Sequence, residues 1–266
     1  MSLAQTFEKG ESGRDREIEV ERLRTLLRDS GTTPEVRRRG PAQGGAIPMH
    51  ECLSLLVPGG VLERGTIVAL PPRPGSSPQL GTGPGYLALG LLAGATAGGA
   101  WAAAVGFPDL GIAAAAGLGA DLSRFLLLDE PGDRWPEAVA LLAKAVDIVL
   151  LRLPHRPTGQ QVRVLTSKVR TTERQRGAVL VVAGDWPEAH LRMRTDRQQW
   201  FGLGEGTGHL TGRRAAIVSD GRATRGRNRT ADLWLPGADG SMSAYSEASG
   251  AQWNPHAGTR PRLRIA

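Results

Sequence analysis

Short apolar segments alternate with helical patterns through the middle of the chain, and this alternation constrains the fold more than any other feature. The apolar segments are residues 66–70, 101–105, 124–128, 148–153 and 178–183. The helical patterns between them are residues 86–97, 110–118, 136–145 and 159–176. Two strands that are connected through a helix lie parallel to each other in the sheet. A parallel sheet is covered on both faces, so its strands are apolar throughout. The sequence therefore predicts an α/β fold with a mostly parallel sheet flanked by helices.

One of these helices carries a clear start signal. Thr158 with Gln161 three residues later makes a capping box, in which each side chain satisfies a backbone N–H at the helix start. Val162, Leu165 and Val169 then recur at helical spacing. We expect these three side chains to form the buried stripe of the helix.

The run from Pro74 to Pro108 has no charged residue, which raises the question of a membrane span. A transmembrane helix needs about 20 predominantly apolar residues. Here glycine interrupts the run repeatedly, and alanine dominates where leucine, isoleucine and phenylalanine would be expected. We therefore expect a buried helix followed by a buried strand, and no contact with a membrane.

The ends of the chain differ from the middle. Residues 14–29 follow helical spacing, with Leu23 and Leu27 on an apolar face that could dock on the core or on a partner, and residues 32–45 are typical of a linker. The first 13 residues lack the apolar core of a secretory signal, and a single cysteine fits a reducing compartment. We expect a cytoplasmic protein in which residues 1–45 precede the core.

After Gly184 the pattern changes to half-buried strands, which we expect to be antiparallel. The predicted strands are residues 191–194, 198–203 and 213–219, with a turn at 204–208. Trp200 and Phe201 supply core bulk to the second of them, an interpretation preferred to a sliding-clamp peptide at 198–203. The core then spans residues 46–220. From residue 221 the chain is rich in arginine, glycine and serine, so we expect a basic, largely disordered tail over 221–266.

The net charge of +7 and a pI near 10.6 favour nucleic acid or an acidic partner. Arginine accounts for 30 of the 33 basic residues, since the chain has three lysines, and such a skew also arises from GC-rich coding. Arg222, Arg225, Arg227 and Arg229 form a basic cluster. It could bind DNA weakly and non-specifically, bind a protein, or only face solvent. Trp234 is a candidate partner anchor.

Residues that catalyse reactions or bind metals are scarce. The five histidines and the single cysteine have no metal-ligand spacing, and no serine lies in a Gly-x-Ser-x-Gly nucleophile elbow. We expect no metal site and no hydrolase chemistry.

The loop after the first core strand is where a phosphate-binding motif is due. The order strand, loop, helix begins such a site, which ends in Gly-Lys-Ser/Thr. The corresponding residues are Arg73, Gly75, Ser76, Ser77 and Pro78. No lysine lies near this loop, and its prolines remove backbone N–H groups that a phosphate would need. The loop therefore predicts a protein that binds no nucleotide cofactor.

Residues 46–220 resemble the RecA family of recombination ATPases. Residues 52–65 look like the lead-in to that family's first core strand. Residues 126–133 and 145–151 are similar to its strand, helix and Walker B strand, and 189–194 with 208–219 to its terminal antiparallel strands. The resemblance implies a RecA-like core.

The departures from that family concern its chemistry. Arg152 stands where the Walker B strand should end in a magnesium-ordering acid, while Asp129 and Glu130 imitate that ending one strand too early. Only residues 153–158 and 184–188 remain where the family has DNA-binding loops.

A degenerate RecA-like core of this kind resembles the ImuA family, in particular its actinobacterial branch. The resemblance implies a non-enzymatic accessory protein of SOS-induced mutagenic translesion synthesis. Its implied partners are an ImuB-like Y-family homologue, an error-prone C-family polymerase α subunit and RecA. The alternative is a divergent RecA-like ATPase that regulates recombination or DNA repair, with Asp129 or Glu130 ordering magnesium and Arg73 replacing the lysine.

Overall fold

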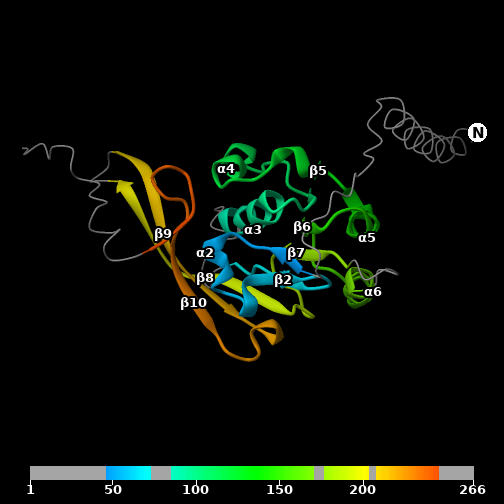
Figure 1. Cartoon of the computed structure of the whole chain (residues 1–266). Coiled ribbons are helices and arrows are strands. Elements are labelled where there is room, and N and C mark those ends of the chain that lie inside the picture. Colours follow the sequence, from blue (N-terminus) through cyan, green and yellow to red (C-terminus); the bar gives the residue numbers. More distant parts are fainter. Residues whose placement is uncertain (1–45, 73–84, 171–176, 204–207, 246–266) are drawn as a thin grey trace, which may run out of the picture. The chain divides into compact units, whose positions relative to one another are not determined.

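A mixed sheet carries the fold of this computed structural model, which describes residues 46–72, 85–170, 177–203 and 208–245. Within these residues the sheet has nine strands in the order β11-β10-β9-β8-β3-β7-β6-β4-β5 (Figure 1). The parallel strands are β3 Ile67–Ala69, β4 Ala102–Val105, β5 Phe125–Leu128, β6 Ile148–Arg152 and β7 Val179–Ala183. The remaining strands are β8 Leu191–Leu203, β9 Gly208–Asp220, β10 Arg229–Trp234 and β11 Ser243–Ala244. The predicted fold class, a mostly parallel sheet followed by antiparallel strands, is confirmed.

Helices cover both faces of the parallel strands (Figure 1). The helices are α3 Gly85–Ala97, α4 Ile112–Gly117, α5 Trp135–Ala145 and α6 Gly159–Arg170. The side chains of α3 and α4 pack into one apolar cluster, and those of α5 and α6 pack into a second cluster on the opposite face. This two-sided burial is why β3, β4 and β7 are apolar along their whole length.

The predicted start of α6 is confirmed. Gln161 N–H donates to the Thr158 hydroxyl at 3.2 Å, and Thr158 N–H donates to Gln161 Oε1 at 2.8 Å. Val162, Leu165 and Val169 are buried, as their spacing predicts.

Helix α3 lies within the run from Pro74 to Pro108 that has no charged residue. It is buried nearly all round, because β1 Ala46–Pro48, α2 Glu51–Ser54 and α4 pack against it in addition to the sheet. A Cβ added at Gly94 would lie 2.0 Å from His50 N, so helix and covering segment are in backbone contact there. The expected buried helix and buried strand are therefore confirmed.

An ion pair joins the amino ends of four neighbouring strands. Arg64 Nη2 lies 2.6 Å from Asp147 Oδ1, and Arg64 Nη1 donates to the carbonyl of Gly177 at 3.3 Å. Asp147 Oδ2 accepts a hydrogen bond of 2.8 Å from the Trp101 N–H. These residues immediately precede β3, β6, β7 and β4, so a single carboxylate fixes where the strands begin relative to one another.

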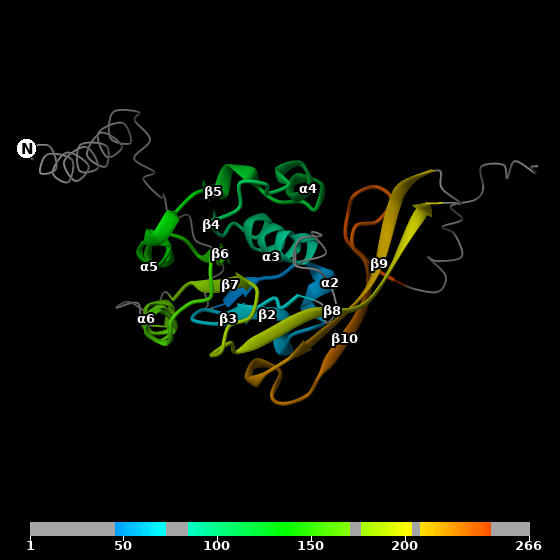
Figure 2. The same cartoon turned by 180° about the vertical axis from the view of Figure 1, so that it is seen from behind.

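The antiparallel part differs from its prediction in two respects. Residues 191–203 form one strand, β8, in place of the two strands expected, and the segment from 221 enters the sheet as β10 and β11. The expectation of a disordered tail is therefore wrong for residues 221–245, and residues 246–266 lie outside the described part of the chain. Figure 2 shows β8, β9 and β10 running together beside the parallel strands.

We predict that Gly94→Ala lowers the free energy of unfolding by about 3 kcal/mol, because the added methyl group meets backbone atoms of residues 49 and 50 that cannot rotate away. Gly159→Ala is the matched control, since a Cβ there meets nothing within 4 Å. Urea unfolding of both variants, followed by circular dichroism, makes the measurement. Equal midpoints for the two variants would contradict the close packing of α3.

Candidate functional site

The carboxyl edge of the parallel strands is where a ligand of an α/β sheet normally binds. After β3 the chain continues into Pro71 and Pro72. The predicted phosphate-loop residues Arg73, Gly75, Ser76, Ser77 and Pro78 lie outside the described residues. The described residues of this edge therefore lie at the ends of β4, β5, β6 and β7.

Arg152 ends β6 at this edge, and its charge is already paired. Its Nη1 lies 2.6 Å from Asp109 Oδ1, in the connection that follows β4, and its guanidinium stacks 4.3 Å from the ring centre of Phe107. The hydrogen bond from Arg152 lowers the pKa of Asp109 below its ordinary value. An arginine cannot order a magnesium ion, and this one is paired with the carboxylate of Asp109.

Asp129 and Glu130 lie at the same edge but far from the loop after β3. They follow β5, and β4, β6 and β7 separate β5 from β3. Four inter-strand steps of about 4.8 Å place the end of β5 about 19 Å from the end of β3. These two carboxylates therefore cannot reach a metal ion that is held at phosphates bound after β3.

The short connections after β6 and β7 are anchored to the core. After β6, His155 lies edge-on to Trp135 of α5, with 6.2 Å between ring centres. After β7, Trp186 is fully buried and donates its Nε1–H to Thr166 of α6 at 3.4 Å. Neither connection projects from the edge as a long binding loop would.

Arg213 of β9 is a buried cation that sequence reasoning missed. Its side chain is 5% exposed, its Nε–H donates to the Leu235 carbonyl at 2.6 Å, and its Nη1 donates to Gln198 Oε1 at 3.4 Å. The guanidinium also faces the rings of Tyr86, at 5.7 Å, and Trp200, at 5.2 Å. Burial lowers the pKa of Arg213. The sequence signal that could have predicted this burial is the position of Arg213, which alternates in step with the inward-facing side chains of β9.

Trp200 itself corrects an expectation. Its side chain is 41% exposed, so it lies over Arg213 at the edge of the core and does not fill the core. Strand β8 extends past the end of β3, because only residues up to Arg192 pair with β3. The bulk expected inside the sheet therefore lies beyond the parallel strands.

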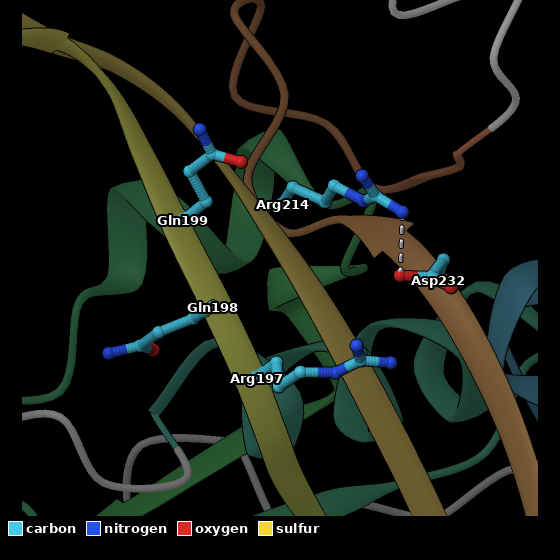
Figure 3. Close-up of a pocket in the computed structure, with 6 residues that line it drawn as sticks. Arg197, Gln198, Gln199, Arg214 and Asp232 are labelled. Carbon is cyan, nitrogen blue, oxygen red and sulfur yellow. Dashed lines mark hydrogen bonds and ion pairs between the residues drawn. The ribbon is translucent and has the colours of Figure 1, made fainter.

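A pocket of about 250 Å³ lies on the outer face of β8, β9 and β10. Arg197, Gln199, Arg214 and Asp232 line it, and Figure 3 shows the ion pair of 3.3 Å between Arg214 and Asp232. Arg214 also stacks 3.7 Å from the ring centre of Tyr245. Among the residues that line the pocket, Arg214 and Asp232 are thus engaged with each other.

The loop between β9 and β10 and the first residue of β10 contain the predicted basic contacts. Arg222, Arg225 and Arg227 lie in the loop, Arg229 begins β10, and all four residues are exposed. We call these four residues the arginine loop. Arg225 adopts a left-handed conformation with φ of 56°, and Arg229 Nη1 donates to the Leu55 carbonyl at 3.3 Å. The structure therefore places the four arginines on one short segment of the chain.

The other predicted contacts lie elsewhere. Trp234 is 7% exposed, and its ring packs against Phe201 at 5.2 Å and Tyr245 at 5.5 Å. Leu23 and Leu27 lie outside the described residues. The structure does not place Trp234 beside the arginine loop, and its role as a partner anchor stays a prediction.

His190 connects the arginine loop to the first parallel strand. Its Nδ1 accepts a hydrogen bond of 3.1 Å from the Ile67 N–H, and its carbonyl accepts one of 2.9 Å from the Ala223 N–H. Burial lowers the pKa of His190, and the nearby charges of Arg222 and Arg170 lower it further, against a smaller opposite effect of Glu188. The ring is therefore neutral at physiological pH, as its acceptor role requires.

Within the described part of the chain, no three or more histidine, cysteine, aspartate or glutamate side chains gather where a metal ion could bind. None of its helices is long and apolar enough to cross a bilayer.

Comparison with known proteins places this architecture in a family. A family model described as the MT3502 N-terminal domain matches residues 55–188, which include the parallel strands, Arg152 and Asp109. The chain belongs to the MT3502 N-terminal domain family. An uncharacterized protein of Mycobacterium tuberculosis, Rv3395c, is 35% identical over 176 residues, which cover 65% of this chain and 76% of that protein. Family membership therefore extends through the carboxyl edge, and a mycobacterial relative supports an actinobacterial family.

We predict that the free energy of unfolding decreases as the pH is lowered from about 7.5 to about 5.5, and that His190 contributes to this decrease. The pKa of His190 is lowered by folding, so its contribution is complete above the ordinary histidine pKa and is lost as the pH falls below it. His50, whose pKa burial also lowers, adds an effect of the same sign.

The measurement is urea unfolding at both pH values. His190→Asn removes the titration and should flatten the pH dependence. His155→Asn, at an exposed site, should leave it as in the unaltered protein. An unchanged slope in His190→Asn would contradict the assigned role.

Proposed function

We propose that this protein is a non-catalytic RecA-like accessory protein of SOS mutagenic translesion synthesis, as its resemblance to the ImuA family implies. The observation that supports the absence of catalysis in this proposal is the position and the pairing of Arg152. A RecA-type ATPase needs a carboxylate at the end of this strand to order magnesium. Here an arginine occupies the position, bonds Asp109 at 2.6 Å and stacks on Phe107.

The order of elements supports the RecA-like part of the proposal. The buried strand β3 is followed along the chain by the buried helix α3. The strand, helix and strand that resemble the Walker B region are β5, α5 and β6, and the terminal antiparallel strands are β8 and β9. Each segment that carried the sequence resemblance therefore has the secondary structure that the resemblance implies.

The implied partners are the ImuB-like protein, the C-family polymerase α subunit and RecA. A protein without nucleotide chemistry acts through its surfaces, and the arginine loop gathers four exposed arginines on the described surface. We propose it as a contact for an acidic partner surface, with weak, salt-dependent DNA binding as a second use. Leu23, Leu27 and Trp234 remain the proposed apolar contacts, and the proposed location is the cytoplasm.

The alternative, a divergent ATPase, needs Asp129 or Glu130 to order magnesium at phosphates held after β3. The separation of about 19 Å between the ends of β5 and β3 argues against that arrangement. A different metal position, supplied by residues outside the described part, would be required.

We predict that the full-length protein gives no binding heat with ATP and Mg²⁺ in isothermal titration calorimetry, and no phosphate release, under conditions in which a RecA protein gives both. The physical reason is the missing lysine and the engaged Arg152. Micromolar ATP binding with turnover would establish the ATPase alternative.

We further predict that the tagged protein retains an ImuB-like protein and RecA on co-purification. Replacing all four residues of the arginine loop with serine should weaken retention of at least one partner, because it removes four exposed charges without touching the core. The matched control replaces Arg134, Arg156, Arg163 and Arg197, which are also exposed, with serine. Failure of the unaltered protein to retain either partner would reject the proposed role.

A further inference from the structure

The edge strand β5 exposes an unusual amount of apolar surface. Leu126, Leu127 and Leu128 are 41%, 48% and 37% exposed, and Leu122 just before them is 39% exposed. Neighbouring β4 and β6 are buried throughout, apart from the partly exposed Arg152. Exposed strand edges normally carry lysine, proline or a bulge that prevents pairing with another chain. Strand β5 has none of these, and its pairing with β4 is regular.

The backbone of β5 has hydrogen-bonding groups available on its outer side. The Gly106 N–H donates to the Leu128 carbonyl at 2.9 Å, so the carbonyl of Leu128 points toward β4. Backbone groups of successive strand residues alternate in direction, so those of Phe125 and Leu127 point away from β4. Within the described residues β5 pairs only with β4. Leu127 therefore presents both a donor and an acceptor to an added strand.

The sequence of β5 is complementary to itself in one antiparallel register. Directly opposed residues of an antiparallel pair must both point toward each other or both point away. A two-fold axis through Leu127 satisfies this rule. It places Leu127 opposite its own copy and Leu126 opposite Leu128, so the contact is apolar.

The charges that flank β5 match in the same register. Arg124 ends the turn Leu122–Arg124 just before β5, and Glu130 lies two residues after β5. The pairing that sets Leu127 on the axis therefore brings Arg124 to the end of the strand pair at which Glu130 of the other copy lies, on both sides of the axis. Arg124 also bonds Asp121 and the Gly99 carbonyl, at 3.2 and 3.0 Å, which holds its guanidinium near the strand. Glu130 is exposed and makes no ion pair with a described residue. Opposite charges facing across a strand pair are stabilising.

We propose that two copies of this chain associate through β5, antiparallel and centred on Leu127, to form one continuous sheet across the dimer. The interface is isologous, since each residue of one copy contacts its symmetry counterpart on the other. A second copy is the occupant because the apolar strand and its flanking charges complement one another only when the strand meets itself in reverse. The proposal is independent of the proposed role in translesion synthesis.

Sedimentation velocity of the full-length protein over a range of concentrations tests the association. We expect a reversible monomer–dimer equilibrium. Leu127→Lys places two ammonium groups together on the axis and should raise the dimer dissociation constant at least about tenfold. The matched control is Leu210→Lys on β9, because Leu210 is also a strand residue and is 51% exposed. It should leave the equilibrium unchanged.

A charge exchange tests the register. The single substitution Glu130→Arg brings the new arginine close to Arg124 of the other copy. It should raise the dimer dissociation constant several-fold. The double variant with Arg124→Glu restores opposite charges and should recover the dimer, which a merely local role of Arg124 would not do. Circular dichroism confirms that each variant is folded.

Three results would overturn the proposal. The first is a full-length protein that stays monomeric at every concentration, including the case in which residues 1–45 or another protein occupy β5. The second is a dimer that Leu210→Lys disrupts and Leu127→Lys does not. The third is a dimer that the charge exchange fails to restore.

Discussion

A single carboxylate at the amino ends of the parallel strands determines how the sheet is arranged. Asp147 bonds both the Arg64 guanidinium and the Trp101 N–H, while Arg64 continues to the carbonyl of Gly177. Strands of three to five residues have few ladder hydrogen bonds with which to define their alignment. A charged group shared among their first residues supplies the alignment, because an ion pair that is largely removed from water tolerates little displacement. The positions of all groups at the opposite, carboxyl edge follow from this arrangement.

Much of this fold could be predicted from the sequence, because the strongest signals are local. Continuous apolar runs located β3 to β7, and the capping box located the start of α6. The antiparallel part was harder. A bulge between Thr195 and Arg197 shifts the inward-facing side chains of β8 by one residue, so one strand looks like two. Strand β10 was missed because an arginine-rich loop precedes it, although Ala231 and Leu233 alternate inward.

The candidate site was predictable only in part. The sequence identified Arg152 by its place at the end of an apolar strand, but its partner Asp109 is 43 residues away, and pairing at that separation depends on the tertiary fold. Arg213 shows the same limit, since its burial depends on Tyr86 and Leu235 from separate segments. The arginine loop was evident as a cluster, whereas its rigid attachment to β3 through His190 was not.

The pairing of Arg152 with Asp109 also bears on how reversible this arrangement is over evolutionary time. A carboxylate introduced at position 152 would break this ion pair and lie beside Asp109, where two like charges repel each other unless a cation is bound between them. Without such a cation the substitution is unfavourable, so the Arg152–Asp109 pair favours the retention of an arginine at the end of β6.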